Sequence, residues 1–208
     1  MQATSASFKD KGVIPGEFAF AVADPKTHIT LSSNKNPELS WSGAPRETKS
    51  FAIICHDPHV PSRGDQVNKE GQTVPASLAR VDFYHWVLVN IPATVTHIAA
   101  GSHSSSVTPR GKTASQSPVG LAGINDYTAW FKGDPEMAGH YFGYDGPCPP
   151  WNDEIKHEYV FMVYALSVEK LPLSGPFTGA EALEAMSGHV LAKTSVVGVY
   201  SLNPAVQL

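Results

Sequence analysis

The sequence has few cysteines, no long apolar run and no leader-like start. Among its 208 residues are only two cysteines, Cys55 and Cys148, which cannot form a disulfide framework, and we expect both to be reduced. No stretch approaches the roughly 20 apolar residues that a membrane helix needs. The first residues show no basic segment followed by an apolar one, so we expect no secretory signal. These absences predict a cytoplasmic protein without a transmembrane segment.

Charge is also scarce. Only 16% of the residues are charged, and the net charge is −4, so the chain has no basic field that would attract nucleic acid. The nucleophile-elbow and zinc-helix motifs are absent, and we predict no catalytic residue, metal or cofactor. A local pocket for a small anion stays compatible with this composition.

Turn-forming residues are abundant, with 17 glycines and 17 prolines beside 42% hydrophobic residues. This composition is typical of a globular chain with many loops. A chain of this length buries roughly 70% of its unfolded surface, so it needs no structural metal or disulfide. We expect one domain over residues 1–208.

Three segments carry strong strand patterns: Ser50 to Asp57, Phe83 to Ile91 and Glu158 to Leu166. The last two are apolar on both faces, which predicts strands in the middle of a sandwich. Weaker candidates are Ile29 to Ser32, Glu38 to Trp41 and Ser195 to Ser201. The sequence therefore predicts a mostly β protein.

One helix is expected near the C-terminus. Thr178 and Glu181 have the spacing of a capping box, and apolar residues then recur at helical intervals up to Val190. Two long segments, 62–81 and 100–152, show no regular pattern; the aromatic residues of the second predict that it is ordered and packed.

The segment "HDPHVP", residues 56–61, places two histidines beside a carboxylate. A metal site is disfavoured, because His56 and Asp57 point to opposite faces of an extended strand. Pro58 is expected to end regular pairing and to turn His59 into a loop.

A pocket is the better interpretation. Asp57 ends one apolar strand face, His85 stands among Phe83, Val87 and Val89, and His157 and Tyr159 share a face of the third strand. If the three strands are neighbours, these four titratable side chains line one concavity. For any single histidine, a hydrogen-bonded structural role is the simpler alternative.

Several motifs in order resemble the phosphatidylethanolamine-binding proteins, and more narrowly the prokaryotic Raf kinase inhibitor-like branch. The similarity runs from about Phe8 to Tyr200 through "NPELSWSGAPRETKSFAIICHDPHVP", "FYHWVLVNIP", "GYDGPCPP", "HEYVFMVYAL" and "SGHVLAKTSVVGVYSL". The resemblance implies an antiparallel β-sandwich with a short C-terminal helix and long loops flanking a pocket. That pocket binds phosphate or a phosphorylethanolamine-like lipid head group.

The family's ligand-binding motifs carry over to eight positions of this chain. They are Asp57, Pro58, Pro61, His85, Gly146, Pro147, His157 and Tyr159. The chain departs from the family pattern at His59 and Glu158, where Asp and Arg are common. It also carries an additional segment over 127–143, and segment 62–81 looks expanded.

Three functions follow as hypotheses. The first is an anion-binding module that inhibits a kinase or protease and pairs as a homodimer, as some relatives do. The second is a hydrolase-type enzyme that uses Asp57 and a histidine as an acid/base pair, with Cys148 as the one plausible thiol. The third is a protein-interaction scaffold whose long loops carry the function.

Overall fold

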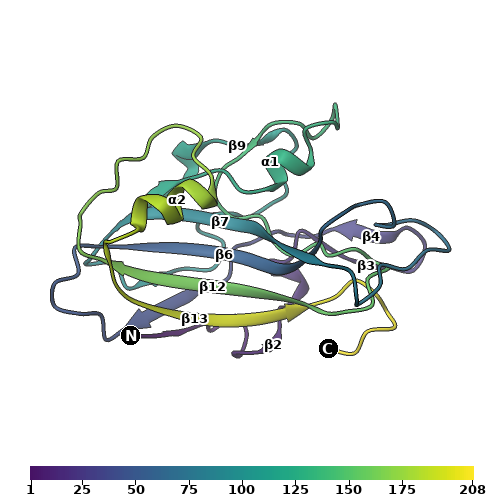
Figure 1. Ribbon diagram of the computed structural model, residues 1–208, viewed down its shortest axis with the longest axis horizontal. Helices are drawn as coiled ribbons and strands as arrows, with labels where there is room; N and C mark the ends of the chain where they lie inside the picture. The colour runs from purple at the N-terminus through teal and green to yellow at the C-terminus, as the bar shows by residue number, and fades with distance from the viewer.

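The computed structural model describes residues 1–208, apart from the side chain of Gln116. Its main sheet has six strands in the order β10-β7-β6-β12-β13-β2. All neighbours are antiparallel except β13 and β2. The strands are β2 (Gly12–Val13), β6 (Ser50–Pro61), β7 (Arg80–Pro92), β10 (Leu121–Ala122), β12 (His157–Leu166) and β13 (Val190–Tyr200). Figure 1 shows the four long strands side by side, with α2 (Gly179–Met186) in front of them.

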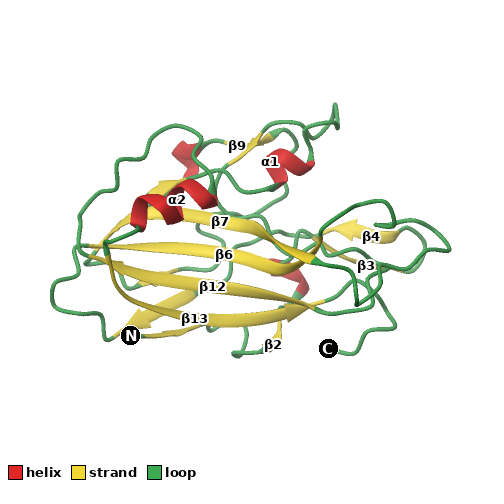
Figure 2. Ribbon diagram, viewed as in Figure 1, coloured by secondary structure: helices red, strands yellow, loops and turns green.

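A second, three-stranded sheet in the order β1-β5-β8 covers the other face of the main sheet. Two strand pairs, β3 with β4 and β9 with β11, complete the β structure, and Figure 2 shows how little of the chain is helical. The remaining elements are β1 (Gln2–Thr4), η1 (Gly16–Phe18), β3 (Ala21–Asp24), β4 (His28–Leu31), β5 (Leu39–Ser42), β8 (His97–Ile98), β9 (Gly111–Lys112), η2 (Ala114–Gln116), α1 (Tyr127–Trp130) and β11 (His140–Tyr141).

The alternation of β6 divides the core into two layers. Phe51, Ile53 and Cys55 face the second sheet in the larger cluster, whereas Ala52 and Ile54 pack toward α2. This division follows from the two-residue period of a strand. The mostly β, antiparallel sandwich predicted from the sequence is confirmed, and the three strong strand segments are indeed neighbours in the order β7-β6-β12.

Two predicted boundaries were wrong. Strand β6 continues through Pro58 to Pro61. A bulge between Asp57 and Val60 interrupts the pairing with β7 at Pro58, so the missing N–H of this proline breaks no hydrogen bond of the ladder. The C-terminal helix has its predicted capping box at Thr178 and Glu181 but ends at Met186, so Val190 begins β13 instead of closing the helix. The turn at Gly188, with a φ of +78°, separates the two elements.

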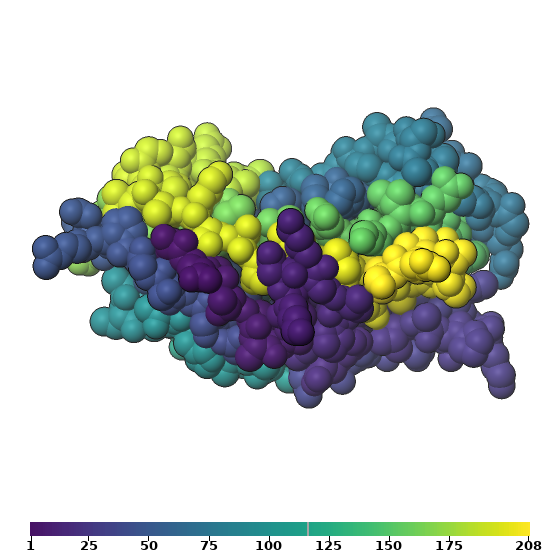
Figure 3. Space-filling view, turned by 90° about the horizontal axis from the view of Figure 1, so that it is seen from below, coloured from purple at the N-terminus to yellow at the C-terminus, as the bar shows by residue number. Residues whose placement is uncertain are grey.

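The ends of the chain lie on one face. Figure 3 shows N-terminal residues and C-terminal residues side by side across this surface, as expected from the pairing of β2 with β13. Within the described chain, no helix is long and apolar enough to cross a membrane.

The second irregular segment is packed, as its aromatic residues predicted. Tyr127 and Tyr141 form a cluster with Phe20, while Tyr144 lies in the main core. The short elements α1, β9, β10 and β11 lie in this segment and were not predicted. Each has two to four residues, too few for a periodic pattern to show.

Candidate functional site

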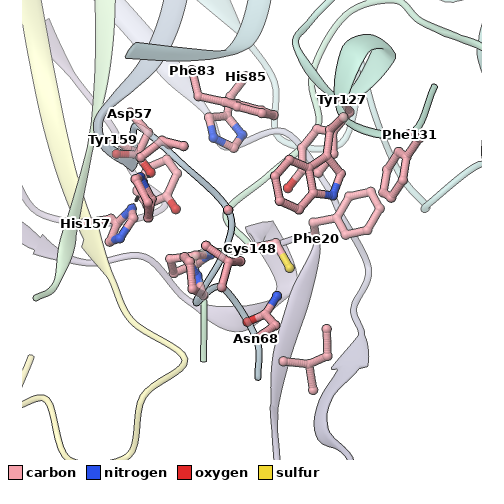
Figure 4. Close-up of a pocket in the computed structure, with 18 of the residues that line it drawn as sticks. Phe20, Asp57, Asn68, Phe83, His85, Tyr127, Phe131, Cys148, His157 and Tyr159 are labelled. Carbon is pink, nitrogen blue, oxygen red and sulfur yellow. Dashed lines mark hydrogen bonds and ion pairs between the residues drawn. The ribbon is translucent and has the colours of Figure 1, made fainter. Parts of the chain in front are cut away.

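A pocket of about 320 Å³ lies where β6 ends and where β7 and β12 begin, beside the β3-β4 hairpin (Figure 4). It is lined by Phe20, Ile29, Leu31, Asp57, Val60, Pro61, Gly64, Val67, Asn68, Phe83, His85, Tyr127, Trp130, Phe131, Met137, Cys148, Pro149, Pro150, His157 and Tyr159. The four titratable residues predicted to line one concavity, Asp57, His85, His157 and Tyr159, are all among them.

His85 reaches the pocket through a β-bulge. Cys55 pairs with Trp86 and His56 with Tyr84, so His85 is an additional residue without a partner on β6. Such a residue shifts the alternation of the strand and re-aims its side chain. The expectation that His85 shares a face with Val87 and Val89 was therefore wrong, because those valines pack toward α2.

His157 is held between two carboxylates. Its Nδ1 is 2.7 Å from Oδ2 of Asp57, and its Nε2 is 3.2 Å from Oδ2 of Asp153. Asp153 in turn accepts two hydrogen bonds from the guanidinium of Arg80, at 2.5 and 3.0 Å. The side chains of His157, Asp57 and Asp153 are almost completely buried. Two cations and two anions thus alternate in one hydrogen-bonded series, in the order Arg80, Asp153, His157, Asp57.

This series of charged groups favours the protonated form of the His157 imidazole. Burial alone would lower the pKa of His157, but hydrogen bonds to Asp153 and Asp57 outweigh it and raise the pKa above its usual value. Burial would likewise raise the pKa of Asp153, but its hydrogen bonds with His157 and Arg80 lower it. A protonated His157 donates to both carboxylates, so neither of its ring nitrogens is free for a ligand.

Two groups on the same wall have hydrogen-bonding capacity to spare. Nδ1 of His85 donates to the carbonyl oxygen of Asp145 at 2.8 Å, which leaves Nε2 without a partner among the described residues. Burial lowers the pKa of His85, although the charge of Asp57 opposes this. The hydroxyl of Tyr159 is buried and makes no hydrogen bond of normal length in the described structure, although the carboxylate of Asp57 lies close enough to interact with it. Burial and the nearby Asp57 raise its pKa well above the usual value, so the phenol stays protonated.

The other predicted site residues divide into two groups. Pro61 lines the pocket, whereas Pro58, Gly146 and Pro147 do not. The Gly-Pro pair instead supports the wall, because the carbonyl of Gly146 accepts from the hydroxyl of Tyr127 at 2.9 Å. The carbonyl of Pro147 accepts from the backbone N–H of Phe20, also at 2.9 Å.

Gly146 is required by packing. A Cβ at this position would lie 2.2 Å from the carbonyl oxygen of Phe18, a backbone atom that cannot swing away. We expect Gly146→Ala to lower the free energy of unfolding by about 1–3 kcal/mol, the usual cost of overpacking. Urea denaturation measures this loss. Gly133→Ala is the control, because a Cβ there meets nothing within 4 Å; equal stability of both variants would contradict the prediction.

The segment "HDPHVP" does not converge on one point. Nε2 of His56 lies 4.0 Å from Asp82, away from the pocket. The backbone N–H of His59 donates to Oδ1 of Asp57 at 2.7 Å, and its Nδ1 accepts from the backbone N–H of Glu158 at 3.2 Å. His59 thus helps to hold the carboxylate of Asp57 in place through its backbone N–H. No cluster of three or more His, Cys, Asp or Glu side chains in the described part of the chain is arranged to hold a metal ion.

Sequence reasoning missed several residues that shape the site. Asp153 lies in the loop before β12 and Arg80 at the first position of β7, where no periodic pattern marks them. Phe83 could have been found from the sequence, because it begins the apolar strand run that contains His85. In the structure it pairs directly with Asp57 across β6 and β7. Phe20 and Tyr127 come from segments far apart in sequence and stack at 4.6 Å between ring centroids.

Cys148 lines the pocket as a protonated thiol. Burial raises the pKa of this thiol to about 12, so almost none of it is thiolate at neutral pH. The thiolate is the nucleophilic form of cysteine. This environment favours a packing role for Cys148 over the nucleophile that a hydrolase would need.

Comparison with known proteins places the chain in a family. The family model described as phosphatidylethanolamine-binding protein matches residues 4–201. The UPF0098 protein YbcL of Escherichia coli is 31% identical over 81% of this chain and 73% of its own. A UPF0098 protein of Methanothermobacter thermautotrophicus is 30% identical over 96% of this chain and 98% of its own.

The fold agrees with these matches. A crystal structure of E. coli YbcL, described as a new member of the mammalian PEBP family, has a TM-score of 0.68 and 28% identity over 96% of this chain and 97% of that one. The chain thus belongs to the phosphatidylethanolamine-binding protein family.

Proposed function

We propose that this protein binds a small phosphate-like anion, either phosphate or a phosphorylethanolamine-like head group, at the polar end of the pocket. The observation that carries the proposal is that the buried hydroxyl of Tyr159 and Nε2 of His85, neither of which has a hydrogen-bond partner among the described residues, line the same pocket. Unsatisfied buried polar groups are rare in proteins and usually have a partner that the structure does not contain. Both groups can donate a hydrogen bond to an anion, His85 in its protonated form.

The nearby carboxylates do not oppose this function. The charge of Asp57 is balanced by a protonated His157, and that of Asp153 by Arg80. The four groups together carry no net charge, so an anion beside His85 is not repelled by the wall as a whole. Asp57 also favours the protonated form of His85, because an opposite charge raises a histidine's pKa. Pro61 supplies an apolar contact at the edge.

Calorimetric titration with phosphate and with phosphorylethanolamine tests the proposal. We expect binding by the wild type, no detectable binding by His85→Ala, and roughly tenfold weaker binding by Tyr159→Phe, since hydrogen bonds to charged groups contribute about 1.5–3 kcal/mol. Tyr159→Phe removes only an unpaired hydroxyl and should fold normally.

Tyr164→Phe is the matched control, because Tyr164 lies on the same strand but packs on the α2 side. Equal affinity of the wild type, His85→Ala and Tyr159→Phe would show that the pocket does not hold the anion.

The resemblance also implies inhibition of a kinase or protease and assembly as a homodimer. Both stay predictions. Size-exclusion chromatography with light scattering tests the homodimer, and inhibition assays on a kinase and protease panel test the inhibitory role. The hydrolase hypothesis is weaker, because the protonated Cys148 offers no thiolate and His157 has no free ring nitrogen.

A further inference from the structure

The pocket has two chemically different halves. Figure 4 shows Asp57, His157 and Tyr159 together on one side, and the aromatic rings of Phe20, Tyr127 and Phe131 on the other. Four further lining residues are largely apolar, namely Ile29, Leu31, Trp130 and Met137. The apolar half offers a ligand few hydrogen-bonding groups: the Tyr127 hydroxyl is already bonded, and the others are the indole N–H of Trp130 and the amide of Asn68.

The two long segments noted in the sequence build this pocket from opposite sides. Segment 127–143 supplies Tyr127, Trp130, Phe131 and Met137, and segment 62–81 supplies Gly64, Val67 and Asn68. Both segments therefore contribute to the apolar half, together with Phe20, Ile29 and Leu31 from the β3-β4 hairpin and the residue before it.

The apolar wall is preformed. The ring of Phe20 stacks on Tyr127 with an interplanar angle of 14°, and Tyr127 stacks on Phe131 at 18°. The turn after α1 is fixed by Asp134, whose carboxylate accepts from the backbone N–H groups of Glu136 and Met137. A rigid aromatic wall binds an apolar group without the entropic cost of ordering it first.

The mouth of the apolar half carries two exposed apolar side chains. Leu31 on β4 is 57% exposed and Trp130 on α1 is 55% exposed, and both also line the pocket. Large apolar side chains exposed beside a concave site are typical of a surface that is covered by a ligand.

We propose that the ligand is an amphiphile with an anionic head and one short apolar tail, and that the tail lies between the aromatic wall and Ile29. The head-group part rests on the proposed function. A volume of about 320 Å³ exceeds what a bare phosphate ion fills and lies at the lower end of the roughly 300–1,000 Å³ of small-molecule sites. It suits a single tail, while a two-chain phospholipid would leave its chains outside.

Calorimetry with methyl, butyl and octyl phosphate tests the tail separately from the head. Each buried methylene should tighten binding about threefold to fourfold, so butyl phosphate should bind at least about tenfold more tightly than methyl phosphate. The gain should stop once the tail fills the pocket. Phenyl phosphate, as a further arm, distinguishes a flat aromatic tail from an acyl-like one.

Variants at the mouth locate the tail. We expect Trp130→Ala and Leu31→Ala to bind methyl phosphate as the wild type does but to lose at least about threefold in affinity for octyl phosphate. Leu191→Ala is the control, because Leu191 is an exposed apolar residue on β13 that does not line the pocket. Both mouth residues are more than half exposed, so the variants should fold.

The outcomes separate this inference from the proposed function. If methyl phosphate binds and longer tails add nothing, the tail site is wrong while the anion site stands. If no alkyl phosphate binds, the anion site itself fails and the tail site fails with it. Binding to phosphatidylethanolamine vesicles that exceeds binding of octyl phosphate would overturn the single-tail ligand in favour of a two-chain lipid.

Discussion

Replacing His157 with alanine should lower the free energy of unfolding by about 3–5 kcal/mol, the usual cost of removing one partner from a buried ionic group. The reason is the carboxylate on each side of this imidazole. Without His157, Asp57 loses its only cationic hydrogen-bond partner, and Asp153 keeps Arg80 alone. A buried carboxylate without a partner is among the most destabilising groups a protein can contain.

Urea denaturation at pH 6 measures this loss. His97→Ala is the control, because His97 is 56% exposed and its pair with Glu38 should contribute little. A loss below about 1 kcal/mol for His157→Ala would contradict the prediction, because it would mean that no buried cation bridges the two carboxylates.

The stabilisation by His157 has a defined pH window. The pKa of His157 is raised in the folded protein, so its contribution is fully present below the unfolded value of about 6.5 and is lost as the pH rises through the folded pKa. The pKa of Asp153 is lowered, so its contribution is present above about 3.8 and is lost as the pH falls through the folded pKa. The excess stability of the wild type should therefore be largest between these limits.

Much of the sandwich could be predicted because its strands obey a simple period. Phe51, Ile53, Cys55 and Asp57 share one face of β6, and the register of β12 then brings His157 and Tyr159 to the same end. Runs buried on both faces belong in the middle of a sheet. The family motifs pointed to the same four residues as the strand faces did, because the pocket is built at the ends of those central strands.

The rest depends on irregular backbone. A bulge adds one residue to β7, and this single insertion moves His85 from the α2 side to the pocket side. Alternation cannot reveal such an insertion. Asp153 and Arg80 meet across 73 residues of sequence, through a loop and the first residue of a strand. The motif predicts Gly146 as a ligand contact, and no sequence pattern shows that its missing Cβ also allows the close approach to the carbonyl oxygen of Phe18.

The hydrogen bonds of the wall limit which chemistry the pocket can recognise. A backbone carbonyl can only accept, so Nδ1 of His85 must carry the proton in its bond to Asp145. In the neutral ring Nε2 is then an acceptor, and burial keeps the ring neutral by lowering its pKa. Sulfate and a phosphate diester have no proton to give to that nitrogen, whereas hydrogen phosphate still carries one at neutral pH. His85 must therefore take up a proton before it can donate to an anion.

Sulfate binding should consequently take up about one proton per site near pH 7 to 8. The affinity for sulfate, which does not titrate in this range, should rise about tenfold for each pH unit of acidification down to the pKa of His85, as linkage requires. Calorimetry at one pH in buffers of different ionisation enthalpy measures the proton directly. His56→Ala is the matched control, because burial also lowers the pKa of His56 but its ring lies outside the pocket.

Sulfate and phosphate together identify the atom that carries the proton. Uptake with both anions places it on His85, because sulfate stays fully ionised. Phosphate binding without uptake would mean that the hydroxyl of hydrogen phosphate, which is already protonated at this pH, donates to Nε2 of a neutral His85. Tight binding of sulfate without any uptake would contradict the prediction, since an unprotonated Nε2 would face a fully ionised oxygen. Tyr159, whose hydroxyl is an uncharged donor, should contribute equally in all three cases.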